Sequence, residues 1–497
     1  MIRTHGRART RYAALAAVGL LAVVGCSSSS KKAVTTTPPA ATTASTTAST
    51  TAATTASSAT TPATTPAGGS TATSPTATSD TTASTATADT TPSTSAAPAA
   101  WKAPVDKCSD PDAVTKPITG EIKVGSVLPI SGTPAVAFAP VKEGLELYYN
   151  YANANNLLPG VKITSEIKDD QYDPTQTPTA VDAEIDDKVD MFSGIIGTPN
   201  NIAVRDELNT DCYPQLNALS GDPAFADAKD YPWTTGALVP YDIEAKIYVA
   251  KLKDLIGDGG TIGLFSVNSD FGKVYTDAFK AAASDAGLKI VDEETIEPDE
   301  TAPPTNQVDA IAAKKPAAIM AIPLGAQCPT FLQEVKKAEA ATSGWTPIVF
   351  QTNTCALTLL ISTLAAGAGD GVYTSSNILD PGDPANASNA GVKAFQAAYA
   401  AAGLKDDPST VAVGWTVAES TVNILAAAQK TGTLSRETIM EAARSITFTP
   451  SLGRPGTVYK MNGLTDTEPF QSLTVLQWNE KNKTYTDIGT ENSTFES

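Results

Sequence analysis

Adjacent carboxylates at Asp169 and Asp170 are the first feature of this chain that suggests acid–base chemistry. They follow an alternating stretch, 161–168, that predicts a strand. Two neighbouring carboxylates at the end of a strand cannot both face one substrate, because successive side chains point to opposite faces. We therefore expect a solvated loop here rather than a catalytic pair.

Histidine is almost absent from the chain. The single histidine, His5, lies within the first 25 residues, which we expect to be removed. Its loss excludes Ser-His-Asp and Cys-His catalysis and histidine-ligated metal sites. A Ser-Lys or two-carboxylate enzyme would still be compatible with the composition, but no motif for one is present. We expect no enzyme: no catalytic residues, no metal and no cofactor.

The stretch Gly197-Thr198-Pro199-Asn200 has the composition of a helix start that binds a small solute. Helix N-termini offer free backbone N–H groups and the positive end of the helix dipole. Gly197 allows close approach of the backbone, Thr198 suits the N-cap, and Pro199 suits the first helical position. The alternative is an ordinary N-cap with no ligand.

Four cysteines beyond Cys26 form an even set, which in an exported protein favours two disulfides. Three pairings are possible. Cys108 and Cys212 fall in one expected domain, and Cys328 and Cys355 follow parallel strands of the other. We therefore predict Cys108–Cys212 and Cys328–Cys355, against the alternative of free buried thiols.

The N-terminus has the pattern of an export signal. Four arginines precede a short apolar run at 13–24, too short to span a membrane. The run ends in Val-Val-Gly-Cys, which resembles a bacterial lipobox, in which the cysteine carries the lipid. We predict a signal peptide at 1–25 and lipidation of Cys26, against an ordinary signal with an incidental cysteine.

Ala, Thr, Ser and Pro make up nearly all of the segment 33–100. Such a segment has too few large apolar side chains to offset the entropy of ordering its backbone. We expect a disordered stalk over 26–100, either a possible O-glycan carrier or a plain spacer.

Charge excludes a polyanionic partner. The net charge of −18 becomes −22 when the four arginines of the signal are removed. Nucleic-acid binding needs a basic face, so we expect no nucleic acid as a partner. No further segment has the apolar length that we would expect of a membrane helix.

Strands and helices alternate through the rest of the chain. This alternation predicts parallel sheets covered on both faces, and it restarts after a strong amphipathic helix at 241–256, so we expect two sheets. Open parallel sheets bind ligands beyond the carboxyl ends of their strands. Strands are predicted at 121–130, 161–168, 190–196, 214–219, 261–266, 289–296, 317–323, 347–351, 457–460 and 472–478. The other helices are predicted at 140–155, with Pro140 in the first turn, and at 177–187, 200–208, 273–286, 308–314, 331–340, 390–402, 411–430 and 436–446.

Four motifs then resemble the type I periplasmic binding proteins, and in particular the Leu/Ile/Val-binding branch of ABC-transporter lipoproteins. They are VGSVLPISG at 124–132, KDDQYDPTQTPTAVDAEI at 168–185, FSGIIGTPNNIAV at 192–204 and GLFSVNSDFGKVYTDAF at 263–279. Their order and spacing extend the resemblance over 119–478. The family implies an α/β fold of two flavodoxin-like, doubly wound parallel-sheet lobes joined by a three-strand hinge.

The resemblance implies domain borders. After the lead-in 101–118, the binding domain at 119–490 is expected to comprise lobe 1 at 119–238 and 372–455 and lobe 2 at 239–371 and 456–497.

The resemblance also implies a ligand site. Thr198 falls where the family has a serine that holds the ligand carboxylate, and the loop 220–222 faces the carboxylate and the ammonium. Asp222 is either the ammonium partner or the start of a turn before Pro223. Phe271 takes the place of an aromatic lid residue, and Phe138 flanks the cleft or belongs to the core. The expected ligand-binding residues are Ser131, Phe138, Thr198, Asn200, Ser220, Asp222, Phe271, Gln327 and Asn353.

Asn353 departs from the family, which has an acidic residue at this place to receive the ammonium. Asparagine cannot neutralise a buried cation. This puts a free α-amino acid in doubt and leaves an amide, a urea-like solute, a carboxylate or an aromatic acid.

The implied function is that of an extracytoplasmic solute-binding lipoprotein of an ABC importer. It would capture a small polar solute, amino-acid-like or amide, between the lobes and deliver it to a membrane permease. The alternative is a ligand-sensing receptor domain of the same fold that signals to a membrane partner. We expect a monomer, anchored by its lipid at the outer face of the cytoplasmic membrane.

Overall fold

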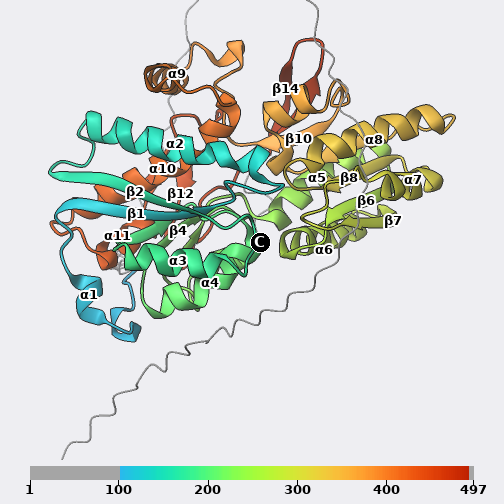
Figure 1. The fold of residues 1–497 in the computed structure, drawn as a ribbon. Helices are drawn as coiled ribbons and strands as arrows, with labels where there is room; N and C mark the ends of the chain where they lie inside the picture. The colour runs from blue at the N-terminus through green and yellow to red at the C-terminus, as the bar shows by residue number, and fades with distance from the viewer. Residues whose placement is uncertain (1–100, 492–497) are drawn as a thin grey trace, which may run out of the picture. The chain divides into compact units, whose positions relative to one another are not determined.

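The computed structural model describes residues 101–491 (Figure 1). The expected signal peptide at 1–25, the lipid site Cys26 and the stalk to residue 100 lie outside the described residues, as does 492–497.

Five parallel strands form the sheet of the first lobe, in the order β2-β1-β3-β4-β5. This is the order of flavodoxin-like sheets. The strands are β1 Gly120–Leu128, β2 Val161–Asp169, β3 Met191–Ser193, β4 Gln215–Ala218 and β5 Thr234–Gly236. They match the predicted positions, apart from β5, which the sequence did not reveal.

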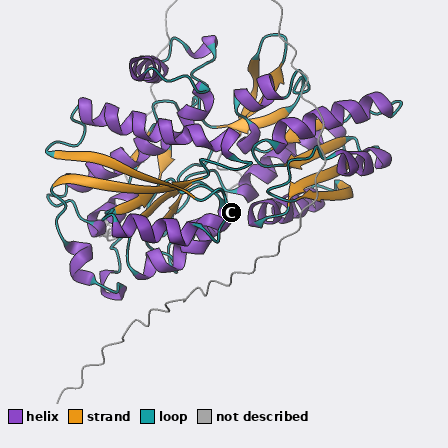
Figure 2. Ribbon diagram, viewed as in Figure 1, coloured by secondary structure: helices purple, strands orange, loops and turns teal. Residues whose placement is uncertain are grey.

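Helices cover both faces of this sheet (Figures 1 and 2). Ile122 and Val124 of β1 pack towards α2 (Ala135–Ala154) and α10 (Pro408–Gln429), whereas Val127 packs towards α3 (Thr177–Asp186) and α4 (Thr198–Thr210). The alternation of side chains along β1 thus builds two separate apolar layers.

The second lobe repeats the pattern with an extension. Its sheet has the order β14-β13-β10-β9-β8-β6-β7, in which β13 pairs antiparallel with both of its neighbours, β10 and β14, and the other pairs are parallel. Helices α5 and α6 pack on one face, and α7 and α8 on the other. The strands are β6 Thr261–Val267, β7 Lys289–Ile296, β8 Ala318–Ile322, β9 Ile348–Gln351, β10 Tyr373–Ser376, β13 Leu473–Asn479 and β14 Thr484–Glu491. The helices are α5 Tyr241–Ile256, α6 Asp270–Asp285, α7 Thr305–Lys314 and α8 Gln327–Ala341.

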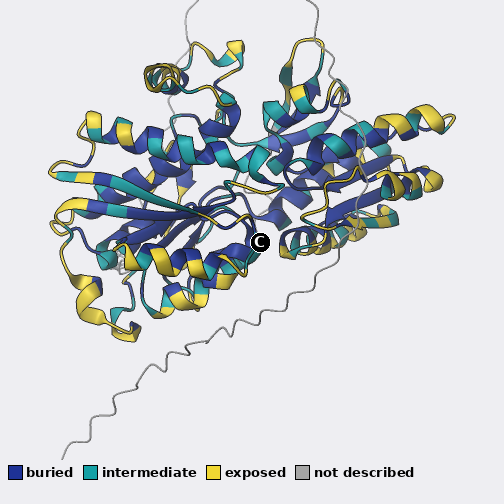
Figure 3. Ribbon diagram, in the orientation of Figure 1, coloured by how far each residue is buried: buried dark blue, intermediate teal, exposed yellow. Residues whose placement is uncertain are grey.

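The central strands of both sheets are buried, and exposed residues gather on the outer helices and turns (Figure 3). The structure therefore confirms the expected fold class of two doubly wound α/β lobes. The remaining elements are α1 Pro111–Thr115, α9 Ala390–Ala402, α11 Arg436–Ala443, β11 Thr447–Phe448, β12 Tyr459–Lys460, a π-helical turn Leu359–Leu364 and the 3-10 turns Val105–Lys107, Pro223–Ala226, Asn353–Cys355 and Pro384–Asn386.

Two expected lobe borders are displaced. The strand β10 pairs with β9 and β13, so the chain leaves the second sheet after Ser376 and not at 372. Tyr459 of β12 donates its hydroxyl to Asn217 Oδ1 in β4 at 3.2 Å, so the first lobe extends past 455. Strand pairing decides the first border and a buried hydrogen bond the second, and neither composition nor spacing reveals these contacts.

Helix α2 begins at Ala135, five residues before the predicted start, so that Pro140 lies inside the helix. Ala137 of this extra turn is buried against the second lobe in a cluster with Cys328 and Cys355. Tertiary packing thus outweighs the hydrogen bond that Pro140 cannot make.

Glycines bring α2 and α10 into close contact. A Cβ atom on Gly144 would lie 2.0 Å from the carbonyl oxygen of Val411, and one on Gly414 would lie 2.0 Å from that of Val141. Alanine at either position would force the two helices apart.

Helix α10 is long and apolar enough to cross a membrane, contrary to the expectation that no further segment would be. Most of its apolar window is buried in the first lobe, where it packs along α2. A core helix shares this composition with a membrane span because both are surrounded by apolar atoms.

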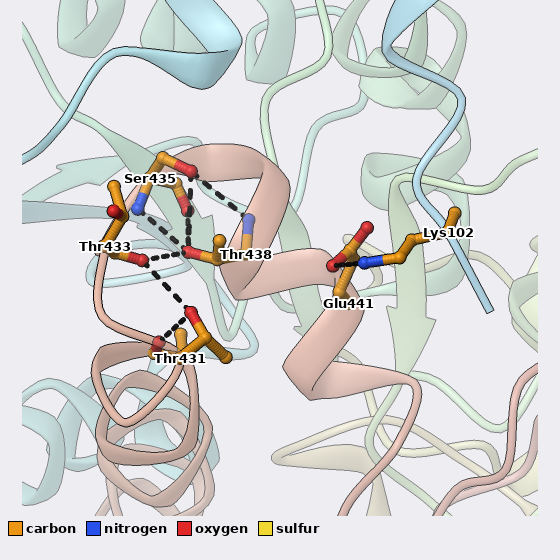
Figure 4. A network of polar contacts seen from close by, with 7 residues as sticks. Lys102, Thr431, Thr433, Ser435, Thr438 and Glu441 are labelled. Carbon is orange, nitrogen blue, oxygen red and sulfur yellow. Dashed lines mark hydrogen bonds and ion pairs between the residues drawn. The ribbon is translucent and has the colours of Figure 1, made fainter. Parts of the chain in front are cut away.

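The lead-in 101–118 packs on the first lobe. Lys102 Nζ pairs with Glu441 of α11 at 2.8 Å (Figure 4), and a disulfide joins Cys108 to Cys212, as predicted. Figure 4 also shows the capping box between Ser435 and Thr438 that starts α11.

Candidate functional site

A cavity of about 170 Å³ lies where the carboxyl ends of the two sheets meet. Its walls include residues that directly follow β3, β4 and β5 in the first lobe and β8 and β9 in the second. An engineered apolar cavity of ~150 Å³ takes up benzene, so the space suits a solute of at least that size. The strand ends of both sheets thus face one cavity, as the alternating pattern predicted.

Apolar side chains dominate the walls. They come from both lobes and from the segments that cross between them. They include Phe138, Val141, Ile196, Leu219, Leu238, Phe271, Leu324, Leu357, Leu379, Val413, Val417, Phe470 and Leu476. Phe138 lines the cavity and also packs against the main core.

The start of α4 forms one polar corner of the cavity. Gly197 is the N-cap with φ of 107°, and a Cβ there would lie 2.3 Å from Asn200 Oδ1. Only glycine fits such a place. Thr198 is therefore the first helical residue rather than the expected cap, and Pro199 follows it.

The hydroxyls of Thr198 and Ser220 are paired with each other. They lie 2.7 Å apart, and both side chains are buried. Ser220 Oγ also accepts the backbone N–H of Asp222 at 3.1 Å. Thr198 lines the cavity, whereas Ser220 lies behind it.

Asp170 is buried, so the expectation of a solvated loop is wrong for this residue. Its carboxylate accepts hydrogen bonds from Thr177 Oγ1 and Asn200 Nδ2, both at 2.8 Å, and from the N–H of Tyr172 at 3.0 Å. Burial raises its pKa despite these bonds. Asn200 is consequently a support for the loop and does not line the cavity.

Asp169 points away from Asp170 and holds the first loop. It accepts the Ser131 hydroxyl at 2.5 Å and the N–H groups of Ile130 and Gln171 at 2.9 and 3.0 Å. Burial pushes its pKa up, but these bonds outweigh burial and leave the pKa lowered. The hydroxyl of Ser131 is thereby bonded to Asp169, and Ser131 does not line the cavity.

Asp222 begins a turn and does not line this cavity. Its carboxylate accepts the N–H of Ala224 at 2.9 Å and caps the 3-10 turn that starts at Pro223. Burial raises its pKa. Of the two interpretations of Asp222, the structure therefore supports the turn.

The second lobe contributes aromatic rings and the loop after β9, which a hydrogen bond to Glu244 fixes in place. Phe271 lines the cavity, and its ring lies 5.3 Å from that of Tyr241, which also lines it. Asn353 lines the cavity as well, and its N–H donates to Glu244 Oε1 at 2.8 Å. Burial raises the pKa of Glu244 to about 7, although hydrogen bonds from Tyr248, Asn353 and Ser375 lower it.

Gln327 supports the second lobe and does not line the cavity. Its side chain accepts the N–H of Leu324 at 3.2 Å and donates to the carbonyl of Glu297 at 2.8 Å. Beside it, Cys328 and Cys355 form the predicted disulfide. Four of the nine expected residues thus line the cavity: Phe138, Thr198, Phe271 and Asn353.

Sequence reasoning missed Asp380 and Arg454, the only charged residues among 101–491 that line the cavity. Both lie in segments that cross between the lobes, where no helix or strand pattern marks their place. The isolated bridge between Ile378 and Gly453 brings these segments together. Tyr172 and Tyr241 were missed too. Tyr172 follows the carboxyl end of β2, which is a usable signal, whereas Tyr241 follows β5, which the sequence did not reveal.

Comparisons with known proteins agree with this architecture. The sequence matches the periplasmic binding protein family over residues 121–483. No curated protein sequence matched the chain.

Solved structures show the same fold. A branched-chain amino acid ABC transporter protein from Thermus thermophilus, solved with bound valine, has a TM-score of 0.68 at 17% identity. The match covers 76% of this chain and 98% of that one. A fatty acid ABC transporter substrate-binding protein from Thermomonospora curvata has a TM-score of 0.64 at 22% identity, covering 77% of this chain and 96% of that one.

An extracellular ligand-binding receptor from Rhodopseudomonas palustris HaA2 has a TM-score of 0.60 at 22% identity, covering 74% of this chain and 100% of that one. The family and the fold are those of extracytoplasmic solute-binding proteins rather than of enzymes. The family match over most of the folded part shows that this chain belongs to the periplasmic binding protein family, and the paired sheets with the cavity between them give it the type I fold.

Proposed function

We propose that this protein is the lipid-anchored solute receptor of an ABC importer and that its solute is bound in the cavity between the two sheets. The observation that carries the proposal is the cavity itself, which takes walls from the strand ends of both lobes. A solute held by both lobes favours the closed arrangement by its differential affinity, and a permease can recognise that arrangement.

The walls of the cavity revise the expected solute. A small polar solute, amino-acid-like or amide, would leave most of the apolar wall without a matching surface. Ligand sites bury most of a ligand's surface and fix it with a few polar groups. We therefore propose a solute with an apolar body and one polar end. Two structural neighbours, one solved with bound valine and one described as a fatty acid transporter protein, are associated with solutes that both carry apolar groups.

The anchor and the permease belong to the same proposal. Cys26 follows a short apolar run and a glycine, the arrangement of a lipidated cysteine. Cys26→Ser should abolish labelling by a radioactive or clickable fatty acid and release the protein from membranes. Persistent labelling of this variant would contradict lipidation at Cys26.

A thermal-shift screen tests the solute site. The panel holds amino acids, amides, aromatic acids and straight-chain fatty acids, and a true ligand at 100 times its dissociation constant adds about 2.7 kcal/mol of stability. Val413→Trp fills the cavity from α10 and should abolish the shift. Val458→Trp makes the same change at an exposed position outside the cavity and should preserve it. A shift that survives in Val413→Trp would contradict the proposed site.

A further inference from the structure

Arg454 is a fixed cation at the wall of the cavity. Its backbone N–H donates to the carbonyl of Asn377 at 3.0 Å, and its side-chain Nε donates to the carbonyl of Ile378 at 3.1 Å. Both bonds tie it to the neighbouring crossing segment. The guanidinium group is thereby held in place without the use of its two outer amino groups.

Those outer amino groups have no acceptor. Among residues 101–491, neither Nη atom of Arg454 has a hydrogen bond, and Arg454 takes part in no ion pair within 4.0 Å. Burial lowers the pKa of Arg454, while the charges of Asp487, Asp380 and Asp383 raise it. Arginine keeps its proton under such conditions, so the cavity wall carries a positive charge with free donors.

The nearby carboxylates already have donors of their own. Asp380 accepts the Thr358 hydroxyl at 2.5 Å and the N–H of Gly382 at 2.7 Å. Asp383 accepts the N–H of Ala385 and the hydroxyl of Thr484. At this end of the cavity the cation is therefore the charged group whose outer donors have no protein acceptor within residues 101–491, and an acceptor on the solute can pair with them.

The opposite polar corner is already satisfied. Thr198, where the family resemblance placed the ligand carboxylate, shares a hydrogen bond with Ser220. A ligand carboxylate there would have to break this buried pair, whereas at Arg454 it would meet free donors. A guanidinium fork matches a carboxylate with two parallel hydrogen bonds.

We propose that Arg454 receives the carboxylate of the solute and that the solute is a monocarboxylic acid with an apolar body. This inference rests on the proposed function, because it takes the cavity as the solute site. Apolar walls accept the body, and the one free cation of the cavity wall within residues 101–491 accepts the acid group. An amine that binds Asp380 is the competing outcome.

The test uses four probes on the purified protein by calorimetry: octanoate, octanamide, octylamine and leucine. Wild type should bind octanoate at least tenfold more tightly than the other three. Arg454→Gln should weaken octanoate at least tenfold, the scale of a hydrogen bond to a charged group, and leave octanamide nearly unchanged. Arg454→Lys keeps the positive charge but cannot form two parallel hydrogen bonds. Its affinity for octanoate should lie between those of wild type and Arg454→Gln.

Arg436→Gln is the matched control. Arg436 also donates Nε to a backbone carbonyl, that of Asp190 at 2.8 Å, but it does not line the cavity. Its octanoate affinity should equal that of wild type. Circular dichroism should show all three arginine variants to be folded.

Asp380→Asn separates the competing outcome. It should strengthen octanoate binding, because the wall of the cavity loses a negative charge near the bound carboxylate. Tighter binding of octylamine or leucine than of octanoate, or no octanoate binding at all, overturns the proposal. If octanamide, octylamine or leucine then still binds wild type and Val458→Trp but not Val413→Trp, the cavity remains the solute site. In that case only the role of Arg454 fails.

Discussion

The two lobes hold their cavity-facing loops by different means. In the first lobe, buried polar groups tie the loops together, centred on Asp170 and its bonds to Thr177 and Asn200. In the second lobe, the Cys328–Cys355 disulfide joins the loops after two strands, and apolar side chains surround it.

This difference shows that one fold can fix its binding loops by hydrogen bonds or by a covalent link. A buried polar network is rigid only while all its members are satisfied. A disulfide stabilises the fold by restricting the unfolded chain, and this effect does not require that neighbouring polar groups be satisfied. The two lobes should therefore respond differently to single substitutions.

Asp170→Ala should produce the largest loss. It removes the acceptor of three hydrogen bonds from buried or half-buried donors. Each such bond to a charged group contributes about 1.5 kcal/mol, so the free energy of unfolding should fall by about 3–5 kcal/mol. Urea denaturation measures this. Asp173→Ala, in the same loop but with exposed partners, should cost less than about 1 kcal/mol. Equal losses in the two variants would contradict the network.

Removal of the second-lobe disulfide should cost about 2–4 kcal/mol. The double variant Cys328→Ser with Cys355→Ser opens a link between residues 27 positions apart. Peptide mapping of unreduced wild type should recover the two cysteines in one linked fragment. Free thiols at these positions would show that no covalent link holds the loops of the second lobe.

Glu244 gives the second lobe a buried polar group as well, and its charge should depend on pH. Its folded pKa of about 7 lies above the ordinary 4.5, so the unfolded chain loses this proton first as pH rises. Stability should therefore fall between about pH 4.5 and 7, by up to about 1.4 kcal/mol per pH unit from this group.

Urea denaturation at several pH values gives the slope of the free energy of unfolding against pH. Glu244→Gln should remove the part of that slope that comes from Glu244. Glu121→Gln, at an exposed position, should keep the wild-type slope. Identical slopes in wild type and Glu244→Gln would show that the carboxyl of Glu244 does not titrate in this range.

Thr198→Val should have the smallest effect, about 1 kcal/mol of unfolding free energy, because Ser220 loses one partner but keeps the N–H of Asp222. Binding of a carboxylate solute should weaken less than in Arg454→Gln. A greater loss of binding in Thr198→Val would return the carboxylate to the start of α4, where the family resemblance placed it.

The regular parts of this fold were predictable from the sequence. Helix α5 and strand β7 begin and end at the predicted residues, because their periodic patterns and flanking turn residues are strong. Both disulfides were predictable as well. The even cysteine count, the shared domain of Cys108 and Cys212, and the positions of Cys328 and Cys355 after strands restrict the pairing.

The cavity was only partly predictable. Phe271 and Thr198 follow strands in motifs with a recognisable order, whereas Arg454 reaches the cavity through a non-local bridge between Ile378 and Gly453. Asp170 was misassigned because a charged pair in a loop is usually solvated, and only the fold brings Thr177 and Asn200 to it. Contacts between distant segments decide such cases, and sequence periodicity does not contain them.

Hydrogen–deuterium exchange with and without the tightest-binding solute tests most directly whether one solute is held by both lobes at once. The account predicts slower exchange in the loops after β3 and β4 of the first lobe and after β8 and β9 of the second, with no change in α7. Arg454 and its neighbours should be protected as well. Protection confined to one lobe, or found away from the cavity, would contradict the account.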